Sequence, residues 1–405
     1  MKRDKKRLAL GAFLLLVAYY PLVNWTLRRL STTLGSLWED AALIAFMAIA
    51  VVLGWSRIRS LVTSSVFLAG IAYAAMTLFS YAANSYYVGA YIHEARLTFE
   101  PFMAFIIITL LIEDDGATVL RRMAPHLVAC ATLLALVGVS QYVRKVPIPA
   151  QWLDKDLETG VISTRAFSLF GSPNVLAAYL EVILPLAVYL FLERRRPVER
   201  LCFGACTIAI GAGFLLTLTR ASWLSAAGAF LAGLLVLKPI LAGVFAALGA
   251  GLLLAVPTFR LRMATLLSST YIEKSNNLGR LFRWGQAFQN LSRHPLLGSG
   301  LGTFGGTAAQ RFGYFSGISM DSVWIRVLAE TGILGFIAFL VWIAAGFAGV
   351  AVRFSRSGDR LWLFTTIGLL ALLINLFTDN LLNSWAIALL MWTLIALGVS
   401  IRESA

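Results

Sequence analysis

The sequence predicts an all-α polytopic membrane protein with about twelve transmembrane helices. Of its 405 residues, 59% are hydrophobic and only 13% are charged, a composition too apolar for a soluble globular domain. Apolar runs of roughly 17–25 residues recur along the chain, and each is long enough to cross a hydrocarbon core of about 30 Å. No stretch remains for a separate soluble domain, so we expect one membrane domain over residues 1–405.

The first apolar run follows a basic N-terminus, as in a signal peptide. Because no small-x-small cleavage site follows this run, we expect it to be retained as the first span. The expected spans, in order, are 8–23, 38–56, 61–80, 98–112, 124–143, 172–192, 201–219, 221–237, 239–256, 322–346, 361–377 and 385–400.

Short basic connections predict the orientation of the spans. The connections "RIRS", "RRMAPH", "ERRRPVER" and "RFSRSGDR" fall on the same side as the N-terminal "KRDKKR". Positive charge gathers on the cytoplasmic side of membrane proteins, so we expect both termini to be cytoplasmic. This topology and attraction to anionic lipids explain the net charge of +14, and we expect no nucleic-acid partner.

Neither the cysteines nor the histidines have the spacing of a metal site. The three cysteines all fall within apolar runs, and no H-x-E or H-E-x-x-H pattern includes any of the three histidines. We therefore expect no zinc site and no other cofactor, so any chemistry is metal-free or uses a weakly held ion.

Two longer segments, 144–171 and 257–321, fall on the extracytoplasmic side. The second contains more basic than acidic residues: Arg260, Arg262, Lys274, Arg280, Arg283, Arg293 and Arg311 against Glu273 and Asp321. A long loop can be translocated regardless of its charge. The alternative is a binding site for an anion at the outer face of the membrane.

An amphipathic helix is expected within this loop, over residues 279–292. Arg280, Arg283 and Trp284 lie at i, i+3 and i+4 and so share one face, and the apolar stripe consists of Leu281, Trp284, Phe288 and Leu291. Such a helix lies on the membrane or against the bundle. Guanidinium groups form forked bonds to phosphate oxygens, so a lipid phosphate or diphosphate is the expected partner.

The expected helix ends in "HPLLGSGLGTF", which opens with a proline and continues with alternating glycines. Successive backbone N–H groups in G-x-G-x-G can form an anion-binding nest, although the pattern also fits a plain turn. His294 is either a structural hydrogen-bonding group or a base. We include Arg293, His294 and Gly300 among the candidate substrate-binding residues.

Arg220 lies between two apolar runs in "LLTLTRASWL". An ionisable residue at membrane depth is a functional candidate, but it can also mark the end of a span and extend to the surface. Arg165 and Asn174 flank a "GSPN" helix start, whose unsatisfied N–H groups favour anions.

Asp321 precedes the tenth span and has two alternative roles. It can cap the helix by accepting bonds from first-turn amides, or it can act as a general base that faces the arginine cluster. We expect Glu330, nine residues further on, to have a packing role.

Four stretches together resemble the O-antigen ligase and O-antigen polymerase superfamily of bacterial membrane proteins. They are "FSLFGSPNVLAAYL", "LLTLTRASWL", "GRLFRWGQAFQNLSRHPLLGSGLGTF" and "VLAETGILGFIAFL", and they occur in the family's order over roughly residues 163–345. The resemblance implies a GT-C-like fold at the outer face of the cytoplasmic membrane and an undecaprenyl diphosphate-linked glycan as donor. Arg220 and Arg280 match the arginines proposed to hold the diphosphate, and a chain-length regulator is a candidate protein partner.

One departure from the family pattern favours a polymerase. The ligases usually have a His-Asn pair where this chain has Asp321 and Ser322, and polymerase-like members are similar to it in having an acid there. We therefore favour joining of lipid-linked repeat units over transfer of a finished glycan to a lipid A core. We expect the partner of Arg280 to be the substrate and not another residue.

A transporter and a non-catalytic scaffold are the remaining alternatives, since twelve spans with both termini inside are common in carriers. Carriers place charges near the bilayer midplane and show repeated halves. In this sequence the expected spans are nearly free of charge and the polar groups gather at the outer edge. That distribution favours an enzyme that acts at the membrane interface.

Overall fold

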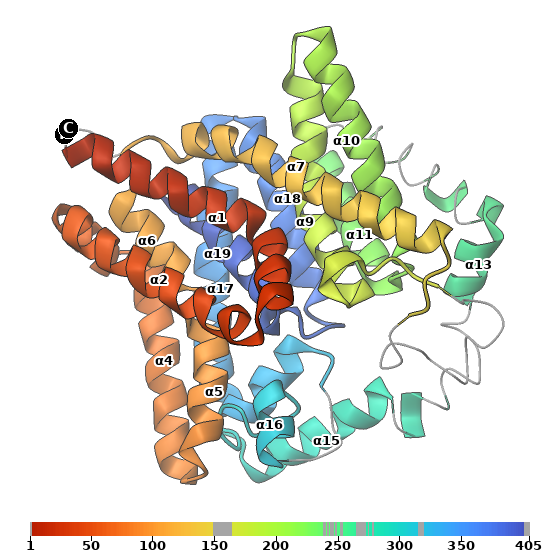
Figure 1. The fold of residues 1–405 in the computed structure, drawn as a ribbon. Helices are drawn as coiled ribbons and strands as arrows, with labels where there is room; N and C mark the ends of the chain where they lie inside the picture. The colour runs from red at the N-terminus through yellow and green to blue at the C-terminus, as the bar shows by residue number, and fades with distance from the viewer. Residues whose placement is uncertain are drawn as a thin grey trace. The chain divides into compact units, whose positions relative to one another are not determined.

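The computed structural model describes residues 2–148, 164–237, 280–314 and 320–400, together with short stretches between 240 and 279. Every regular element in these ranges is a helix (Figure 1). The prediction of an all-α protein is therefore confirmed. The expected span at 239–256 and parts of both expected extracytoplasmic loops, including Lys274, lie outside the described residues.

The helices follow one another closely along the chain. They are α1 (Lys2–Leu30), α2 (Thr32–Gly54), η1 (Trp55–Arg57), α3 (Ile58–Val62), α4 (Ser65–Asn84), α5 (Val88–Phe99), α6 (Met103–Leu111), α7 (Gly116–Val143), η3 (Ser168–Phe170), α9 (Pro173–Glu193), α10 (Pro197–Leu216), α11 (Arg220–Leu237), α13 (Pro257–Ala264), α15 (Arg280–Arg293), α16 (Thr307–Phe312), α17 (Val323–Ser357), α18 (Arg360–Asn375), η5 (Leu381–Asn383) and α19 (Trp385–Val399).

Seven helical stretches in the described part of the chain are long and apolar enough to cross a membrane. They comprise α1, the run from α2 to the end of α3, α4, α7, α9, α10 and α17, and shorter apolar helices occur in α11, α18 and α19. The chain is thus a polytopic membrane protein. The figure of about twelve spans and the GT-C-like arrangement remain predictions.

The expected span at 98–112 is interrupted. The helix α5 ends at Phe99, α6 begins at Met103, and Pro101 lies between them. Proline lacks the N–H that would continue a helical ladder. The 9 residues of α6 extend only about 14 Å, too little to cross the hydrocarbon core alone.

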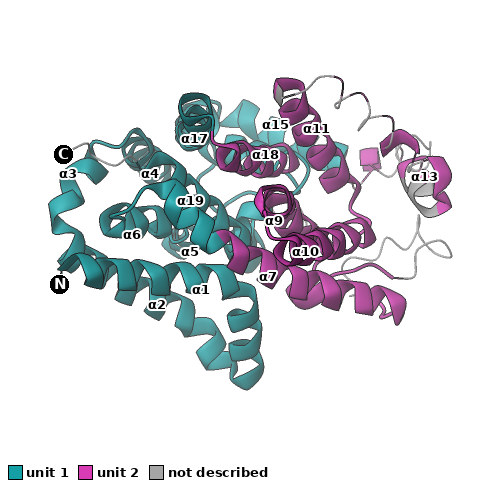
Figure 2. Ribbon diagram, turned by 90° about the horizontal axis from the view of Figure 1, so that it is seen from above, with its two compact units in different colours: residues 1–123, 280–358, 376–405 teal, residues 124–279, 359–375 magenta. Residues whose placement is uncertain are grey.

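The chain divides into two compact units, coloured separately in Figure 2. Unit 1 comprises residues 1–123, 280–358 and 376–405, and unit 2 comprises residues 124–279 and 359–375.

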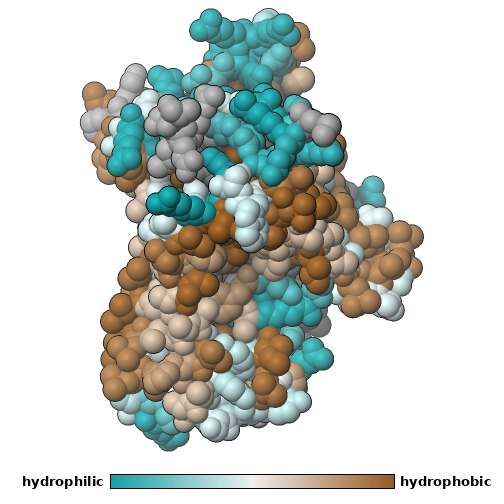
Figure 3. All heavy atoms as spheres, turned by 90° about the vertical axis from the view of Figure 1, so that its left-hand side faces the viewer, coloured by the Kyte–Doolittle hydropathy of each residue, from teal (hydrophilic) through white to brown (hydrophobic). Residues whose placement is uncertain are grey.

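In unit 1, α1 packs on α2, α4 packs along α17, and α15 also contacts α17. Stacked indoles join α17 to α19, since the rings of Trp342 and Trp392 lie 4.6 Å apart. The outward faces of α2 and α4 are apolar (Figure 3), with Val52 72% and Phe79 60% exposed. Exposed apolar side chains on helices of this length are suited to contact lipid.

Charged residues meet at one end of unit 1. Lys6 of α1 pairs with Glu113 at 2.5 Å, Arg7 pairs with Asp114, and Arg353 near the end of α17 pairs with Asp115 at 2.6 Å. The structure thus brings together two basic segments that the sequence assigns to one side of the membrane.

In unit 2, α9 packs against α10 and α18, and α18 also packs against α11. A buried polar network links three of these helices. Asn375 donates hydrogen bonds to Glu181 and to Ser222, each 2.8 Å long, and Ser225 donates to Glu181 at 2.9 Å. Hydrogen-bonded polar groups of this kind fix the mutual orientation of membrane helices.

Candidate active site

The loop helix α15 covers the residues expected for the amphipathic helix, within one position at each end. Its Trp284 and Ala287 pack on a buried cluster with Phe304, Met320 and Ala329. The remainder of the expected apolar stripe is divided, because Leu281 and Phe288 are about half exposed. The helix therefore has one apolar side against unit 1 and further apolar groups facing outward.

Both arginines at the start of α15 reach the same carboxylate. Arg283 donates from Nη1 to the two oxygens of Asp321, at 2.9 and 3.0 Å. The Nε of Arg280 lies 3.4 Å from Oδ2 of Asp321. Each of the three side chains is about one-third exposed, so the cluster is open to a ligand.

This contact corrects the expectation that the partner of Arg280 is the substrate alone. The two arginines are one turn apart on α15, and Asp321 lies close enough to pair with both. A carboxylate between two guanidinium groups offsets their mutual repulsion.

Asp321 does not cap α17. The N-cap is Ser322, whose backbone is extended and whose Oγ accepts a hydrogen bond from the amide of Ile325. The position next to a serine N-cap lies outside the helix, and there the Asp321 carboxylate turns toward α15 instead. Capping is therefore excluded as the role of Asp321, and the role of general base stays a prediction.

A break in α17 joins this helix to the segment after α15. At Gly332 the backbone has φ 66° and ψ −172°, which is not helical. The carbonyls of Pro295 and Leu296 accept hydrogen bonds from Ile333 and Leu334, at 2.9 and 3.2 Å. On the other side of the break, the amide of Ser299 donates to the carbonyl of Ala329, and the amide of Gly300 donates to the carbonyl of Glu330. Residues 295–300 thus replace the ladder bonds that α17 loses.

Two glycines permit this close contact between residues 295–300 and α17. A Cβ at Gly298 would lie 2.5 Å from the amide nitrogen of Gly332, and a Cβ at Gly332 would lie 2.5 Å from the amide nitrogen of Gly298. Both residues also have φ near +66°, where glycine carries no steric cost. The "HPLLGSG" and "ETGILG" motifs are therefore two halves of one backbone contact.

The glycine-rich run contacts Glu330 of α17. The amide of Phe304 donates to the Glu330 carboxylate at 3.1 Å, and the amide of Gly300 donates to the Glu330 carbonyl at 2.7 Å. The Cα of Gly300 also packs tightly on the ring of Tyr86. A contact of Gly300 with substrate stays a prediction.

Arg293 and His294 lie at the opposite end of α15 from Arg280. Both side chains are exposed, and a helix of 14 residues separates its ends by about 20 Å. The structure therefore does not bring these two candidates to the cluster around Asp321.

Arg165 and Asn174 lie together in unit 2. The Arg165 guanidinium donates to the carbonyl of Thr217 at 2.8 Å, to the hydroxyl of Thr219 at 3.0 Å and to the Asn174 amide oxygen at 3.1 Å. Thr219 immediately precedes Arg220, the first residue of α11. Arg165 therefore holds the turn that carries Arg220, which the sequence did not predict.

A buried ionic cluster was missed in the sequence. Arg326 of α17 contacts Glu94 of α5 and also lies 3.6 Å from Glu330 one turn further along α17. All three residues are buried. An arginine inside an apolar run, with a glutamate at i+4, is the signal that could have revealed it.

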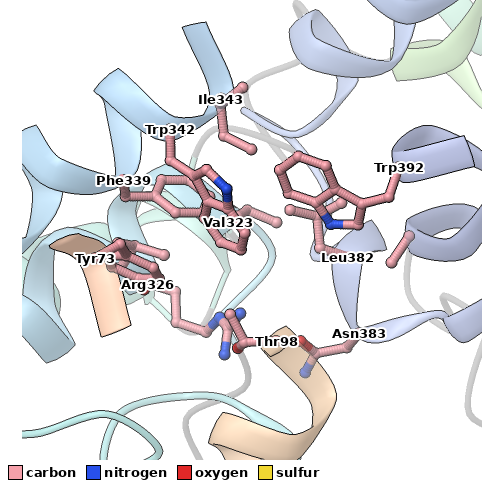
Figure 4. A pocket seen from close by; sticks show the side chains of 12 residues that line it. Tyr73, Thr98, Val323, Arg326, Phe339, Trp342, Ile343, Leu382, Asn383 and Trp392 are labelled. Carbon is pink, nitrogen blue, oxygen red and sulfur yellow. The ribbon is translucent and has the colours of Figure 1, made fainter. Parts of the chain in front are cut away.

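Arg326 also lines a small cavity with Thr98, Asn383 and Trp342 (Figure 4). Its volume is about 20 Å³. Pockets that bind organic ligands usually measure about 300–1,000 Å³. This cavity cannot hold a sugar, so the open cluster of Arg280, Arg283 and Asp321 is the better candidate site.

Taken together, the fold and the cluster define a polytopic membrane protein with a cationic site beside the start of a membrane helix. Residues 205–340 match the family model described as O-antigen ligase. Over this segment the chain is similar to the O-antigen ligase and polymerase superfamily. No curated protein matches it.

The matched segment, about a third of the chain, contains Arg220, the helix α15, Asp321 and the break at Gly332. It indicates a ligase- or polymerase-type function in O-antigen or related polysaccharide synthesis. With the membrane helices, it also indicates a bacterial membrane protein.

Proposed function

We propose that the protein is a polymerase of lipid-linked glycans. It transfers a glycan from undecaprenyl diphosphate to a hydroxyl of a second lipid-linked glycan, at the outer face of the cytoplasmic membrane and with both termini cytoplasmic. The observation that carries this proposal is the shared contact of Arg280 and Arg283 with Asp321, which joins an anion site to a potential base.

The arginines bind the donor diphosphate in this proposal. Asp321 contacts one nitrogen of each guanidinium, and a diphosphate offers more charge and more acceptor oxygens than a single carboxylate. Phosphate oxygens match the guanidinium fork. Fixed cations there also stabilise the negative charge that develops on the leaving group. Arg220, which matches the other of the two arginines in the family resemblance, stays a proposed donor contact on that ground.

Asp321 is the proposed general base. When phosphate oxygens replace the Asp321 carboxylate as the hydrogen-bond partner of Arg283, that carboxylate is free to accept the proton of the acceptor hydroxyl. The acceptor oxygen then bonds to the anomeric carbon of the donor sugar, and the bond from that carbon to the phosphate oxygen breaks. The electron pair leaves with undecaprenyl diphosphate, and the configuration at the anomeric carbon inverts.

A ligase is the second candidate, because the matched family model carries the description O-antigen ligase. The donor chemistry would be the same, and the acceptor would be a lipid A core or another glycolipid. The aspartate at 321 in place of the usual ligase histidine supports the polymerase.

Purified protein in liposomes with an undecaprenyl diphosphate-linked oligosaccharide separates these functions. We expect a ladder of longer glycans and release of undecaprenyl diphosphate, which Arg283→Ala abolishes. Arg311→Ala is the matched control, because it removes an exposed arginine of the same loop. Transfer only to an added lipid A core would establish the ligase, and no transfer to any acceptor would refute both functions.

A further inference from the structure

We propose that Glu94, Arg326 and Glu330 form a buried positioning cluster that holds Asp321 at the distance from Arg280 and Arg283 which glycan transfer requires. The proposed role in transfer rests on the function proposed above. The positioning itself can be measured without any substrate.

The cluster connects three segments of unit 1. Arg326 and Glu330 belong to α17, and Glu94 belongs to α5. Glu330 also accepts the amide hydrogen of Phe304, at 3.1 Å. A Cβ added at Gly306 would lie 3.1 Å from the Glu94 carboxylate, so the chain after Phe304 passes closely over the cluster. One guanidinium thus links α5, α17 and the segment 304–306.

The cluster is connected to both segments that carry the candidate site, the start of α17 with Asp321 and the helix α15 with Arg280 and Arg283. Asp321 lies five residues before Arg326, and the amide of Arg326 donates to the carbonyl of Ser322 in the first turn of α17. On the other side, Asn290 of α15 donates its amide group to the carbonyl of Ala329, at 3.0 Å. The cluster therefore lies between the start of α17 and the anchor of the helix that carries the arginines.

Stability alone does not explain three buried ionisable side chains. Taking ions out of water is costly, and well-packed neutral side chains of similar volume often give equal stability. A guanidinium and two carboxylates differ from neutral side chains in the directional hydrogen bonds that they form. Orientation of the attached segments is the property that such a cluster supplies.

The exposed ion pairs in the last turn of α5 differ in this respect. Arg96 pairs with Asp40 and with Glu100, and its side chain is 46% exposed. Their ion pairs join α5 to α2 and to the residue that follows α5, so these residues provide a matched control within unit 1.

The test removes the buried charges and measures the distance between α15 and the start of α17. The charge-free variant combines Glu94→Gln, Arg326→Met and Glu330→Gln. Arg283→Cys and Asp321→Cys are then introduced after replacement of the three native cysteines, and a short bifunctional maleimide joins the two sites. We expect the cross-linking rate to fall at least fivefold in the charge-free variant while the protein stays folded. Neutralising Asp40, Arg96 and Glu100 should leave the rate unchanged.

The second measurement is glycan transfer, with the arginines and Asp321 intact. Misplacement of reacting groups by about 1 Å can cost about 100-fold in rate, so we expect turnover to fall at least tenfold in the charge-free variant. If this variant does not accumulate, both measurements are made on Arg326→Lys, which keeps the positive charge but lacks the forked guanidinium group. Unchanged cross-linking in a folded variant would overturn the positioning role. Loss of cross-linking together with no transfer by the wild type would leave that role intact and refute the proposed function.

Discussion

Replacing Asp321 with asparagine should strengthen diphosphate binding and abolish transfer at the same time. In the present arrangement Asp321 accepts from Arg283 at 2.9 and 3.0 Å and lies 3.4 Å from Arg280. A donor diphosphate therefore has to compete with this carboxylate for both arginines. Asparagine keeps the shape of the side chain but removes the charge that competes and the base that the reaction needs.

The size of the effect follows from the exposure of the pair. An exposed ion pair contributes about 0–1 kcal/mol, and a hydrogen bond to a charged group contributes about 1.5–3 kcal/mol. The Arg283 and Asp321 side chains are 29% and 28% exposed, which places them between these cases. A contribution of about 1.4 kcal/mol corresponds to a tenfold change in Kd.

The assay measures binding of undecaprenyl diphosphate to purified protein in lipid nanodiscs by calorimetry. We expect Asp321→Asn to lower Kd about tenfold and Arg283→Ala to raise it. Asp40→Asn is the control, because Asp40 pairs with an arginine of α5 and not with α15. Unchanged or weaker binding by Asp321→Asn would refute the competition between carboxylate and diphosphate, and normal transfer by this variant would remove Asp321 as the base.

Three further variants test the packing that surrounds the site. Gly332→Ala should lower the thermal midpoint in detergent and abolish transfer. The new Cβ would strain the positive-φ backbone and collide with a neighbouring backbone segment, at a cost of about 1–3 kcal/mol or more in stability. Gly211→Ala is the control, because it has open space around it and should leave the midpoint unchanged. Tyr86→Phe removes a hydrogen bond to the carbonyl of Leu301, 2.7 Å long, and should reduce stability by about 1 kcal/mol; an unchanged denaturant midpoint would argue against that bond. Burial lowers the pKa of His93, so the folded protein binds fewer protons than the unfolded chain, and stability should be lost as the pH falls below about 6.5. Unfolding midpoints measured at several pH values should show this loss, and His93→Gln should diminish it.

Local patterns predicted most of the fold. Apolar runs indicated the helices because a span must satisfy its backbone internally and cover itself with apolar side chains. The loop helix α15 followed from its own residues, with arginines and apolar groups at helical spacing. The interruption of the expected span 98–112 at Pro101 was not predicted, although proline lacks the backbone N–H that continues a helix and so indicates such a break.

The candidate site was only partly predictable. Charge density in the loop identified Arg280, Arg283 and Asp321 as candidates, but the sequence does not show that they pair. That pairing depends on residues 295–300 meeting α17 at Gly332, a contact between segments more than thirty residues apart. Glycines that permit such contacts look the same in a sequence as glycines in a plain turn or in an anion-binding nest.

The break in α17 at Gly332 also affects how the protein is inserted into the membrane during synthesis. A helix of membrane-crossing length with a gap in its own ladder would expose unpaired amides and carbonyls to hydrocarbon, at a cost of several kcal/mol each. The segment 295–300, which supplies the missing partners, precedes Gly332 in the chain and so leaves the ribosome first. During synthesis the partner is available before the gap enters the bilayer, and the order of the two motifs along the gene suits insertion from the N-terminus. A circular permutation that placed α17 ahead of α15 would preserve the final contacts but reverse this order, and α17 would then have to enter the membrane incomplete.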